Sequence, residues 1–325
     1  MAETTTSSDP APAEKTAGAA AFVLRRRRRR YSLLNRHDKL ILALMVGVPL
    51  AFDLALIWGP TLASVVFSFT NWDGIGALAA NNFVGPRNYA TLVGSYIFFR
   101  PALVHNLIWL GFLALVATPI GMFFAVLLDR EVRGTRIYQS IFYLPVVLPL
   151  VVVGFIWELQ YGATGGFINN AFGLVKNHHI IDWLGDSSVN LLAAVVAASW
   201  RHVGYVMVLY LAGLKSVDPT LREAAKVDGA DERQTFFRVV FPVMAPINVI
   251  IVVITTIESL RAFDIAYIIN HGKNGLELLS TLIVNNSISE ASLVGFGSAV
   301  AVVLLVISLV PIVTFLVNVN RRERA

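Results

Sequence analysis

The stretch DPTLREAAKVDGADERQTFFRVVFP, from Asp218 to Pro242, is charged and rich in helix-forming residues, yet it separates two long apolar runs. A passive connector between two such runs needs no structure of its own, since a loose Ser- and Gly-rich chain would serve. A polar segment with its own helix signals at this place therefore predicts a folded element that another molecule contacts.

The rest of the chain is dominated by apolar runs. Of its 325 residues, 56% are hydrophobic and 14% are charged, whereas a soluble domain carries about a quarter charged residues. Each run is long enough to cross a bilayer as a helix, and none has the strict alternation of a transmembrane barrel. We therefore predict an all-α polytopic membrane protein. Its six expected transmembrane helices are residues 40–69, 101–128, 137–161, 189–214, 247–269 and 292–319.

The positions of the basic residues predict the orientation. With the N-terminus inside, 20 Lys and Arg residues fall in cytoplasmic segments and 4 fall in outside loops. Short cytoplasmic loops carry such an excess, so both termini and residues 218–242 are expected in the cytoplasm. The same distribution accounts for the net charge of +5 without a nucleic-acid partner.

Three regions follow from these patterns. Residues 1–36, which contain a run of arginines at 25–30, are expected to form a disordered basic cytoplasmic tail. Residues 37–320 form the six-span transmembrane domain, and residues 321–325 form a basic cytoplasmic C-terminus. The chain has no cysteine, which excludes disulfides and Cys-ligated metals.

The opening stretch divides into two short helices. Asp218 is a suitable N-cap, and Pro219 suits the first helical position, where its missing N–H has no partner to lose. Gly229 permits the positive φ of a tight bend. The segment ADERQTFFRVV then predicts a second helix, and Pro242 marks the return toward the next span.

Helical spacing places Leu221, Ala224 and Ala225 on one face of the first helix. Two interpretations remain open for this face. It is either a docking surface for another protein, because small residues allow close approach and a charged rim fixes the register, or the face of a connector that lies on the lipid surface. A lipid-facing helix favours bulkier apolar residues than two alanines.

The segment also matches a known motif. Glu223-Ala224-Ala225 is followed after three residues by Gly229, and after nine more by Val239, one residue, and Phe241-Pro242. This resembles the Glu-Ala-Ala loop of the membrane subunits of binding-protein-dependent ABC importers, in which Ile and Leu stand at the two apolar positions of the ending. The sequences DPTLREAA and VDGA resemble the carbohydrate-importer branch.

Three other segments resemble permease subunits of the maltose and glycerol-phosphate type, and in the same order. They are FVGPRNY at 83–89, FDIAYIIN at 263–270 and GFGSAVAVVLL at 295–305. Asn270 stands where Thr is common, and the Gly-rich patch that follows is kept only in part as HGKNG. The resemblance covers about residues 40–320.

The resemblance implies the transmembrane fold of a type I ABC importer, with residues 218–242 as a cytoplasmic coupling loop in the plasma (inner) membrane of a prokaryote. It implies four kinds of partner: a second homologous permease subunit, two copies of a cytoplasmic ABC ATPase, an extracytoplasmic solute-binding protein or lipoprotein, and a small sugar as the transported solute. The residues that it assigns to ATPase coupling are Leu221, Glu223, Ala224, Ala225, Asp228, Gly229 and Ala230.

The chain is therefore expected to be a transport subunit and not an enzyme. It lacks the Gly-x-x-x-x-Gly-Lys-Ser/Thr loop that binds nucleotide phosphates. We expect no cofactor in this chain, with ATP and Mg²⁺ bound by the partner ATPase.

Ionisable residues within the spans are costly and usually face protein or water. Glu258, Arg261 and Asp264 stand at i, i+3 and i+6, so they share one face of the fifth span. We expect them to form an intramembrane ion network with Arg201 of the fourth span. The alternative is that they line the translocation path.

The fourth span contributes SWRHVGY at 199–205, where Trp200 and Tyr205 are candidate substrate contacts because aromatic rings stack on sugar faces. Interior packing is the competing interpretation, and it applies with more force to His202. The alternative function is an ion-coupled secondary transporter that uses Glu258, Arg261 and Asp264. Adjacent His178 and His179 beside Asp182 do not favour a metal site, because neighbouring side chains point apart.

Overall fold

The computed structural model of the chain describes residues 35–130, 133–176, 179–289 and 292–323. Nearly all of the expected tail, residues 1–36, lies outside these ranges, as do His178 and the last two residues of the expected C-terminal segment 321–325. The described residues contain helices and loops but no β-strand, and one isolated bridge pairs Thr70 with Phe83. The all-α prediction is therefore confirmed for the described ranges.

The chain divides into two compact units, residues 1–63 and 64–325. The described part of the first unit is one long, mostly apolar helical segment, and the residues of its most apolar stretch are not buried. Its elements are α2 (Arg36–Asp53), the π-turn η2 (Leu54–Trp58) and the start of α3 (Gly59–Phe67).

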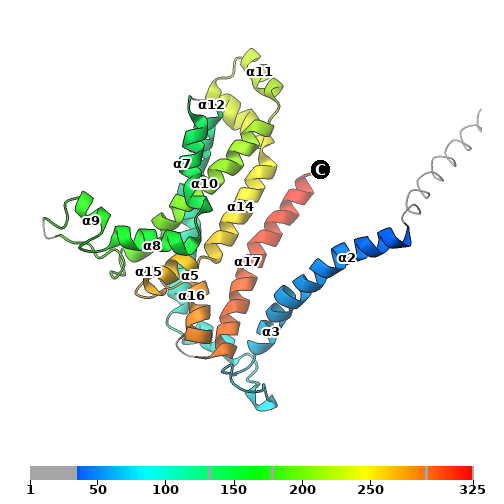
Figure 1. Cartoon of the computed structure of the whole chain (residues 1–325), viewed down its shortest axis with the longest axis vertical. Helices are drawn as coiled ribbons and strands as arrows, with labels where there is room; N and C mark the ends of the chain where they lie inside the picture. Colours follow the sequence, from blue (N-terminus) through cyan, green and yellow to red (C-terminus); the bar gives the residue numbers. More distant parts are fainter. Residues whose placement is uncertain (1–34, 131–132, 177–178, 290–291, 324–325) are drawn as a thin grey trace, which may run out of the picture. The chain divides into compact units, whose positions relative to one another are not determined.

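The second unit holds the remaining helices. Figure 1 shows α11 and α12 at the end where α10 finishes and the path toward α14 begins. In chain order the elements are η3 (Ala80–Asn82), α4 (Arg87–Gly94), α5 (Phe99–Phe112), η4 (Leu113–Ala117), α6 (Thr118–Asp129), α7 (Thr135–Val147), α8 (Leu150–Tyr161), α9 (Phe167–Ala171), α10 (Asn190–Ser216), α11 (Pro219–Val227), α12 (Glu232–Thr235), η5 (Phe236–Val240), α13 (Phe241–Val243), α14 (Ala245–Leu260), α15 (Asp264–Asn270), α16 (Leu279–Val284), η6 (Asn285–Ser289) and α17 (Val294–Glu323).

Four of the six expected spans are single helices by length and composition. They are His37–Phe67, Phe99–Asp129, Asn190–Ser216 and Val294–Thr314. The other two are bent pairs: Thr135–Val147 meets Leu150–Tyr161 at 99°, and Glu232–Val243 meets Ala245–Asn270 at 74°. The count of membrane-crossing helices is thus four, or up to six if each bent pair is one span.

The prediction of one continuous helix for the third span, residues 137–161, is wrong. Leu148 has ψ 138° and Pro149 has ψ 140°, so both leave the helical region between α7 and α8. A proline ring disfavours the helical conformation of the preceding residue and provides no N–H for the helix. The fifth span is also interrupted, because α14 ends at Leu260 and α15 begins only at Asp264.

Three of the four π-turns in the described residues stand directly before an X-Pro pair. η2 precedes Gly59-Pro60, η4 precedes Thr118-Pro119 and η5 precedes Phe241-Pro242. Proline within a helix removes one hydrogen bond and its ring crowds the carbonyl one turn earlier. A wider turn with one additional residue accommodates that crowding, which explains where these turns occur.

Small residues allow α10 to pack closely against its neighbours. A Cβ on Gly121 of α6 would lie 2.8 Å from the carbonyl oxygen of Val203 and 2.9 Å from Val206. A Cβ on Gly204 would overlap the backbone of Phe142 in α7. Such small residues are typical of contacts between membrane helices, and α6, α7 and α10 therefore form one packed group.

The segment FVGPRNY closes the end of α3. The side-chain amide of Asn88 donates to the carbonyl oxygens of Ser68 at 2.9 Å and Thr70 at 2.7 Å. The hydroxyl of Tyr89 donates to Ser68 Oγ at 2.7 Å. The two bonds from Asn88 satisfy carbonyl groups just after the end of α3, and the bond from Tyr89 holds the Ser68 side chain.

Candidate functional site

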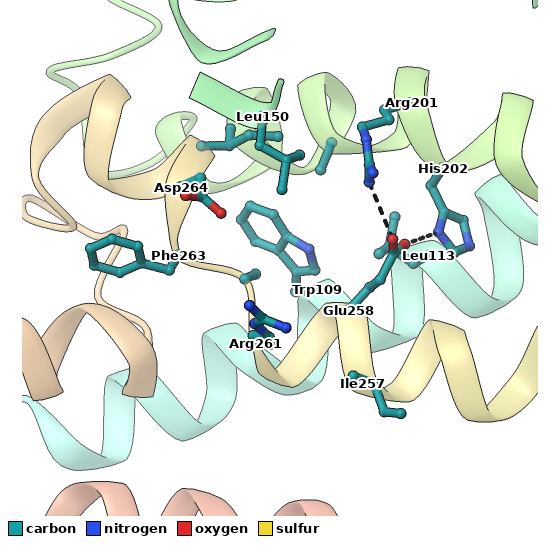
Figure 2. A pocket seen from close by; sticks show the side chains of 13 residues that line it. Trp109, Leu113, Leu150, Arg201, His202, Ile257, Glu258, Arg261, Phe263 and Asp264 are labelled. Carbon is teal, nitrogen blue, oxygen red and sulfur yellow. Dashed lines mark hydrogen bonds and ion pairs between the residues drawn. The ribbon is translucent and has the colours of Figure 1, made fainter. Parts of the chain in front are cut away.

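A cavity of about 280 Å³ lies between the spans. α5, η4, α8, α10, α14 and α15 contribute to its lining, together with the residues that join the last two helices. Figure 2 shows the indole of Trp109 between Asp264 and Glu258. The lining residues are Trp109, Leu113, Leu150, Ala198, Arg201, His202, Ile257, Glu258, Arg261, Ala262, Phe263, Asp264 and Ile265.

Glu258 is the centre of the polar cluster in this cavity. One carboxylate oxygen accepts a hydrogen bond from Arg201 Nη1 at 3.2 Å, and the other lies 2.8 Å from Nδ1 of His202. Both partners are consecutive residues of α10, so the cluster joins α14 to α10. Figure 2 shows both interactions as dashed lines.

His202 extends this cluster to a third helix. The side chain is 2% exposed, and its Nε2 lies 3.2 Å from Thr118 Oγ1 of α6 and 3.4 Å from Thr255 Oγ1 of α14. The Thr255 hydroxyl also bonds the carbonyl oxygen of Ile251 at 2.7 Å. Since both ring nitrogens have partners, His202 links α6, α10 and α14.

The expected ion network is present only in part. Arg201 pairs with Glu258, as predicted, but within the described residues no ion pair joins Arg261 or Asp264 to any partner. The prediction assumed a continuous helix, whereas Arg261 caps the end of α14 and Asp264 starts α15. All three charged residues of the fifth span nevertheless line the same cavity.

The two aromatic residues that we predicted as substrate contacts do not line this cavity. Trp200 is 39% exposed, and its ring meets the edge of Trp157 at 6.0 Å. Trp109 and Phe263 are the aromatic residues of the lining. Sequence reasoning missed Trp109, although it lies in the middle of an expected span, and it underrated His202.

The polar stretch around α11 has the local geometry that its sequence predicts. The Asp218 side chain accepts a hydrogen bond from the Thr220 backbone at 2.9 Å, with Pro219 at the first helical position. This bond from the Thr220 N–H lowers the pKa of the Asp218 carboxyl. Gly229 has a φ of +80°, which is the left-handed bend expected between the two helices.

The second helix has a capping arrangement that sequence reasoning missed. Asp231 accepts from the Gln234 backbone at 2.7 Å, and the Gln234 side chain accepts in return from the Asp231 backbone at 3.2 Å. The spacing Asp-x-x-Gln is the signal that could have identified it.

The apolar face of α11 differs from the expected one. Ala225 is 7% exposed, so it faces the chain's own interior, whereas Leu221 is 38% exposed and Val227 is 88% exposed. Glu223, Ala224 and Asp228 are exposed, and Ala230 is half-buried. The exposed surface of α11 and its C-cap therefore combines both acidic and basic side chains with Leu221 and Val227.

Two ion pairs fasten this element to the end of the second span. Arg222 Nη1 lies 2.8 Å from Asp129 Oδ2, and Arg130 Nη2 lies 2.6 Å from Glu232 Oε2. Sequence reasoning assigned no role to Asp129 or Arg130, because nothing in the chain order indicates that these loops meet.

Metal ligands do not cluster in this part of the chain. Across the described residues, no three His, Cys, Asp or Glu side chains are grouped so that they could hold a metal ion.

The family described as "Binding-protein-dependent transport system inner membrane component" matches residues 117–324. The chain belongs to this family. The permease is a membrane protein and a transport subunit, and the ATPase of such importers is a separate protein, as its sequence predicts. Membership favours the ATP-driven importer over the ion-coupled carrier.

Two curated relatives are each 30% identical to the permease. One is the "Xylose/arabinose import permease protein XacH" of Haloferax volcanii, aligned over 81% of this chain and 83% of the relative. The other is the "Osmoprotective compounds uptake permease protein GgtC" of Synechocystis sp., aligned over 84% of this chain and 95% of the relative.

A solved structure supports the fold of the permease. It is the crystal structure of a bacterial alginate ABC transporter in complex with an alginate pentasaccharide-bound periplasmic protein. One of its chains is similar with a TM-score of 0.73 and 21% identity, covering 86% of the permease and 93% of that chain. At this identity the likeness establishes the fold alone.

Proposed function

We propose that the permease forms half of the translocation path of an ATP-driven importer for a carbohydrate. A second homologous permease subunit completes the path, two copies of a cytoplasmic ATPase bind ATP and Mg²⁺, and an extracytoplasmic binding protein delivers the solute. The pentose name of one relative and the oligosaccharide in the similar structure support the substrate class.

The proposed topology has six spans with both termini in the cytoplasm. Each bent pair then counts as one span, and the basic residues gather on the inner side. In this arrangement the cavity lies within the membrane domain, where Trp109 supplies an aromatic face. Glu258, Arg261 and Asp264 supply hydrogen-bonding groups for a polyhydroxylated solute.

The observation that carries the proposal is the capped, ion-paired element at residues 218–242, whose sequence resembles the Glu-Ala-Ala loop of importer permeases. α11 docks on the ATPase in our proposal, with Leu221, Glu223, Ala224 and Asp228 at or near the contact. Gly229 and Ala230 form the bend, and Ala225 stabilises α11 from inside. A rigid element transmits a displacement, whereas a flexible loop absorbs it.

The test uses Glu223→Lys and Gly229→Asp in the transporter assembled with its ATPase and reconstituted in vesicles. We expect both variants to remain in the membrane while uptake per ATP hydrolysed falls strongly. Val243→Thr, at an exposed position outside the motif, serves as a control and should transport normally. Unchanged uptake in both motif variants would contradict the proposal.

A further inference from the structure

One side chain of α11 joins the ends of two transmembrane helices. Arg222 Nη1 donates to Asp129 Oδ2, the last residue of α6, at 2.8 Å. Nη2 of the same guanidinium donates to the carbonyl oxygen of Leu214, in the last turn of α10, at 3.1 Å. The planar fork of arginine suits two acceptors at once, so Arg222 bridges α6, α10 and α11.

Apolar packing between α11 and the ends of α6 and α10 is incomplete. A cavity of about 210 Å³ lies among these helices, lined by Val126 and Asp129 of α6, Leu214 of α10, and Arg222 and Lys226 of α11. The covalent link between α10 and α11 passes only through Val217 and Asp218, which are not helical. Without the Arg222 bridge, the polar connection from α11 to α6 and α10 would be lost, and α11 would depend on the buried Ala225 and on Val217 of the link.

The Arg222–Asp129 pair is also more protected than its neighbour. The side chains of Arg222 and Asp129 are 34% and 15% exposed, whereas those of Arg130 and Glu232 are 59% and 76% exposed. Ion pairs in contact with water contribute little because water screens them. The Arg222–Asp129 pair is therefore the one better suited to keep a fixed geometry when α11 is displaced.

The helices that Arg222 bridges also meet near the cavity of the membrane domain. α6 packs closely on α10 at Gly121, and the first residue of α6, Thr118, bonds His202 of the Glu258 cluster. A displacement that enters α6 at Asp129 is therefore applied to a helix whose other end contacts His202, a lining residue of the cavity.

We propose that Arg222 is a positioning residue that passes the movement of α11 to the second span through Asp129, so that α6 and α10 move together with α11. This inference rests on the proposed function, since it assumes that an ATPase moves α11. It assigns to Arg222 and Asp129 a role in coupling that is separate from docking.

The test measures uptake per ATP in vesicles, together with copurification of the ATPase. We expect Arg222→Asp and Asp129→Arg each to lower uptake per ATP by about tenfold, the scale of coupling between contacting residues, while the ATPase still copurifies. The double exchange Arg222→Asp with Asp129→Arg should restore part of the loss, because it re-forms the pair with α6, while a carboxylate at position 222 cannot donate to the Leu214 carbonyl. The matched control is Arg130→Glu in the exposed pair, which should change uptake per ATP by no more than about twofold.

A second measurement follows the geometry directly. The chain has no cysteine, so spin labels at Val227→Cys on α11 and Leu127→Cys on α6, both exposed positions, report one distance. We expect this distance to stay constant between nucleotide-free and ATP-bound states, and to broaden or shift in Arg222→Ala. Rescue by the double exchange should restore a single narrow distance.

The outcomes separate the two proposals. A wild-type transporter without ATP-dependent uptake would contradict the importer function and this inference together. If the wild-type importer is active, three results would each overturn the role of Arg222 alone. The single variants could be unaffected, the double exchange could fail to rescue, or the variants could lose ATPase binding.

Discussion

The Glu258 cluster in the membrane domain and the α11 element at its end stabilise polar groups in two different ways. In the first, the Glu258 carboxylate contacts both Arg201 and His202, and two threonine hydroxyls lie near the other ring nitrogen of His202. In the second, Arg222 and Arg130 each have their own acid, and local caps at Asp218 and Asp231 satisfy the backbone.

The difference follows from the availability of water. A polar group that loses its partner in a protein interior remains unsatisfied, whereas a group at the surface is solvated again. The cluster around His202, whose side chain is 2% exposed, is consequently interdependent, whereas the caps and the Arg130–Glu232 pair of the α11 element, which are exposed, are separable. The protected Arg222–Asp129 pair is the exception in that element. Removing single groups from each region tests this contrast.

The largest effect is expected from Glu258→Ala. The change leaves Arg201 and the buried His202 without their acidic partner, and loss of one member of such a pair costs about 3 kcal/mol. Thermal or denaturant unfolding of the purified permease in detergent measures it. Asp264→Ala is the matched control, because Asp264 lines the same cavity without an ion pair in the described ranges, and it should stay within about 0.5 kcal/mol. Equal losses in the two variants would refute the contrast.

A smaller effect is expected from Gly229→Ala. A Cβ at this position meets nothing within 4 Å, so the only penalty is the left-handed backbone at φ +80°. That penalty is about 1 kcal/mol. Hydrogen exchange of the amides in α11 should become faster, while exchange in α10 stays unchanged. Faster exchange in both helices would mean that α11 is not separable from the membrane domain.

The smallest effect is expected from acidification at Asp218. Its carboxyl is exposed and its pKa is lowered from the ordinary value of 3.8, because the ionised form accepts the Thr220 N–H bond. The cap therefore stabilises α11 fully above the pKa of the unfolded chain, and this contribution is lost as the pH falls through the lowered folded-state pKa. Hydrogen exchange at the start of α11, corrected for its intrinsic pH dependence, should show the loss. Asp218→Asn, which keeps an acceptor oxygen without a titratable group, should not respond to pH in this range.

Much of the fold is predictable from local sequence. Apolar run length identified four helices long enough to cross a membrane and the regions of two bent pairs. Cap and glycine signals at Asp218, Pro219 and Gly229 gave the geometry around α11. The 99° bend at Leu148–Pro149 was missed because run length ignores the conformational restriction before proline. The interruption after Leu260 has no comparable signal, since RAF at 261–263 carries neither proline nor glycine.

The sites were less predictable because they depend on tertiary proximity. The pairing of Arg201 with Glu258 followed from the scarcity of intramembrane charges, which leaves few possible partners. The contacts of Arg222 with Asp129 and of His202 with Thr118 join residues 93 and 84 positions apart. No periodicity or motif encodes such distances.

The π-turn at Leu113–Ala117 fixes the angular alignment of the second span. Five of the buried residues in this span, Trp109, Leu113, Ala117, Gly121 and Ala125, recur at every fourth position. That spacing drifts around a regular helix with 3.6 residues per turn. The residue added by the π-turn offsets about 100° of this drift. Deleting one residue there would turn the part of the helix after the π-turn by that angle and carry the Asp129 carboxylate away from Arg222.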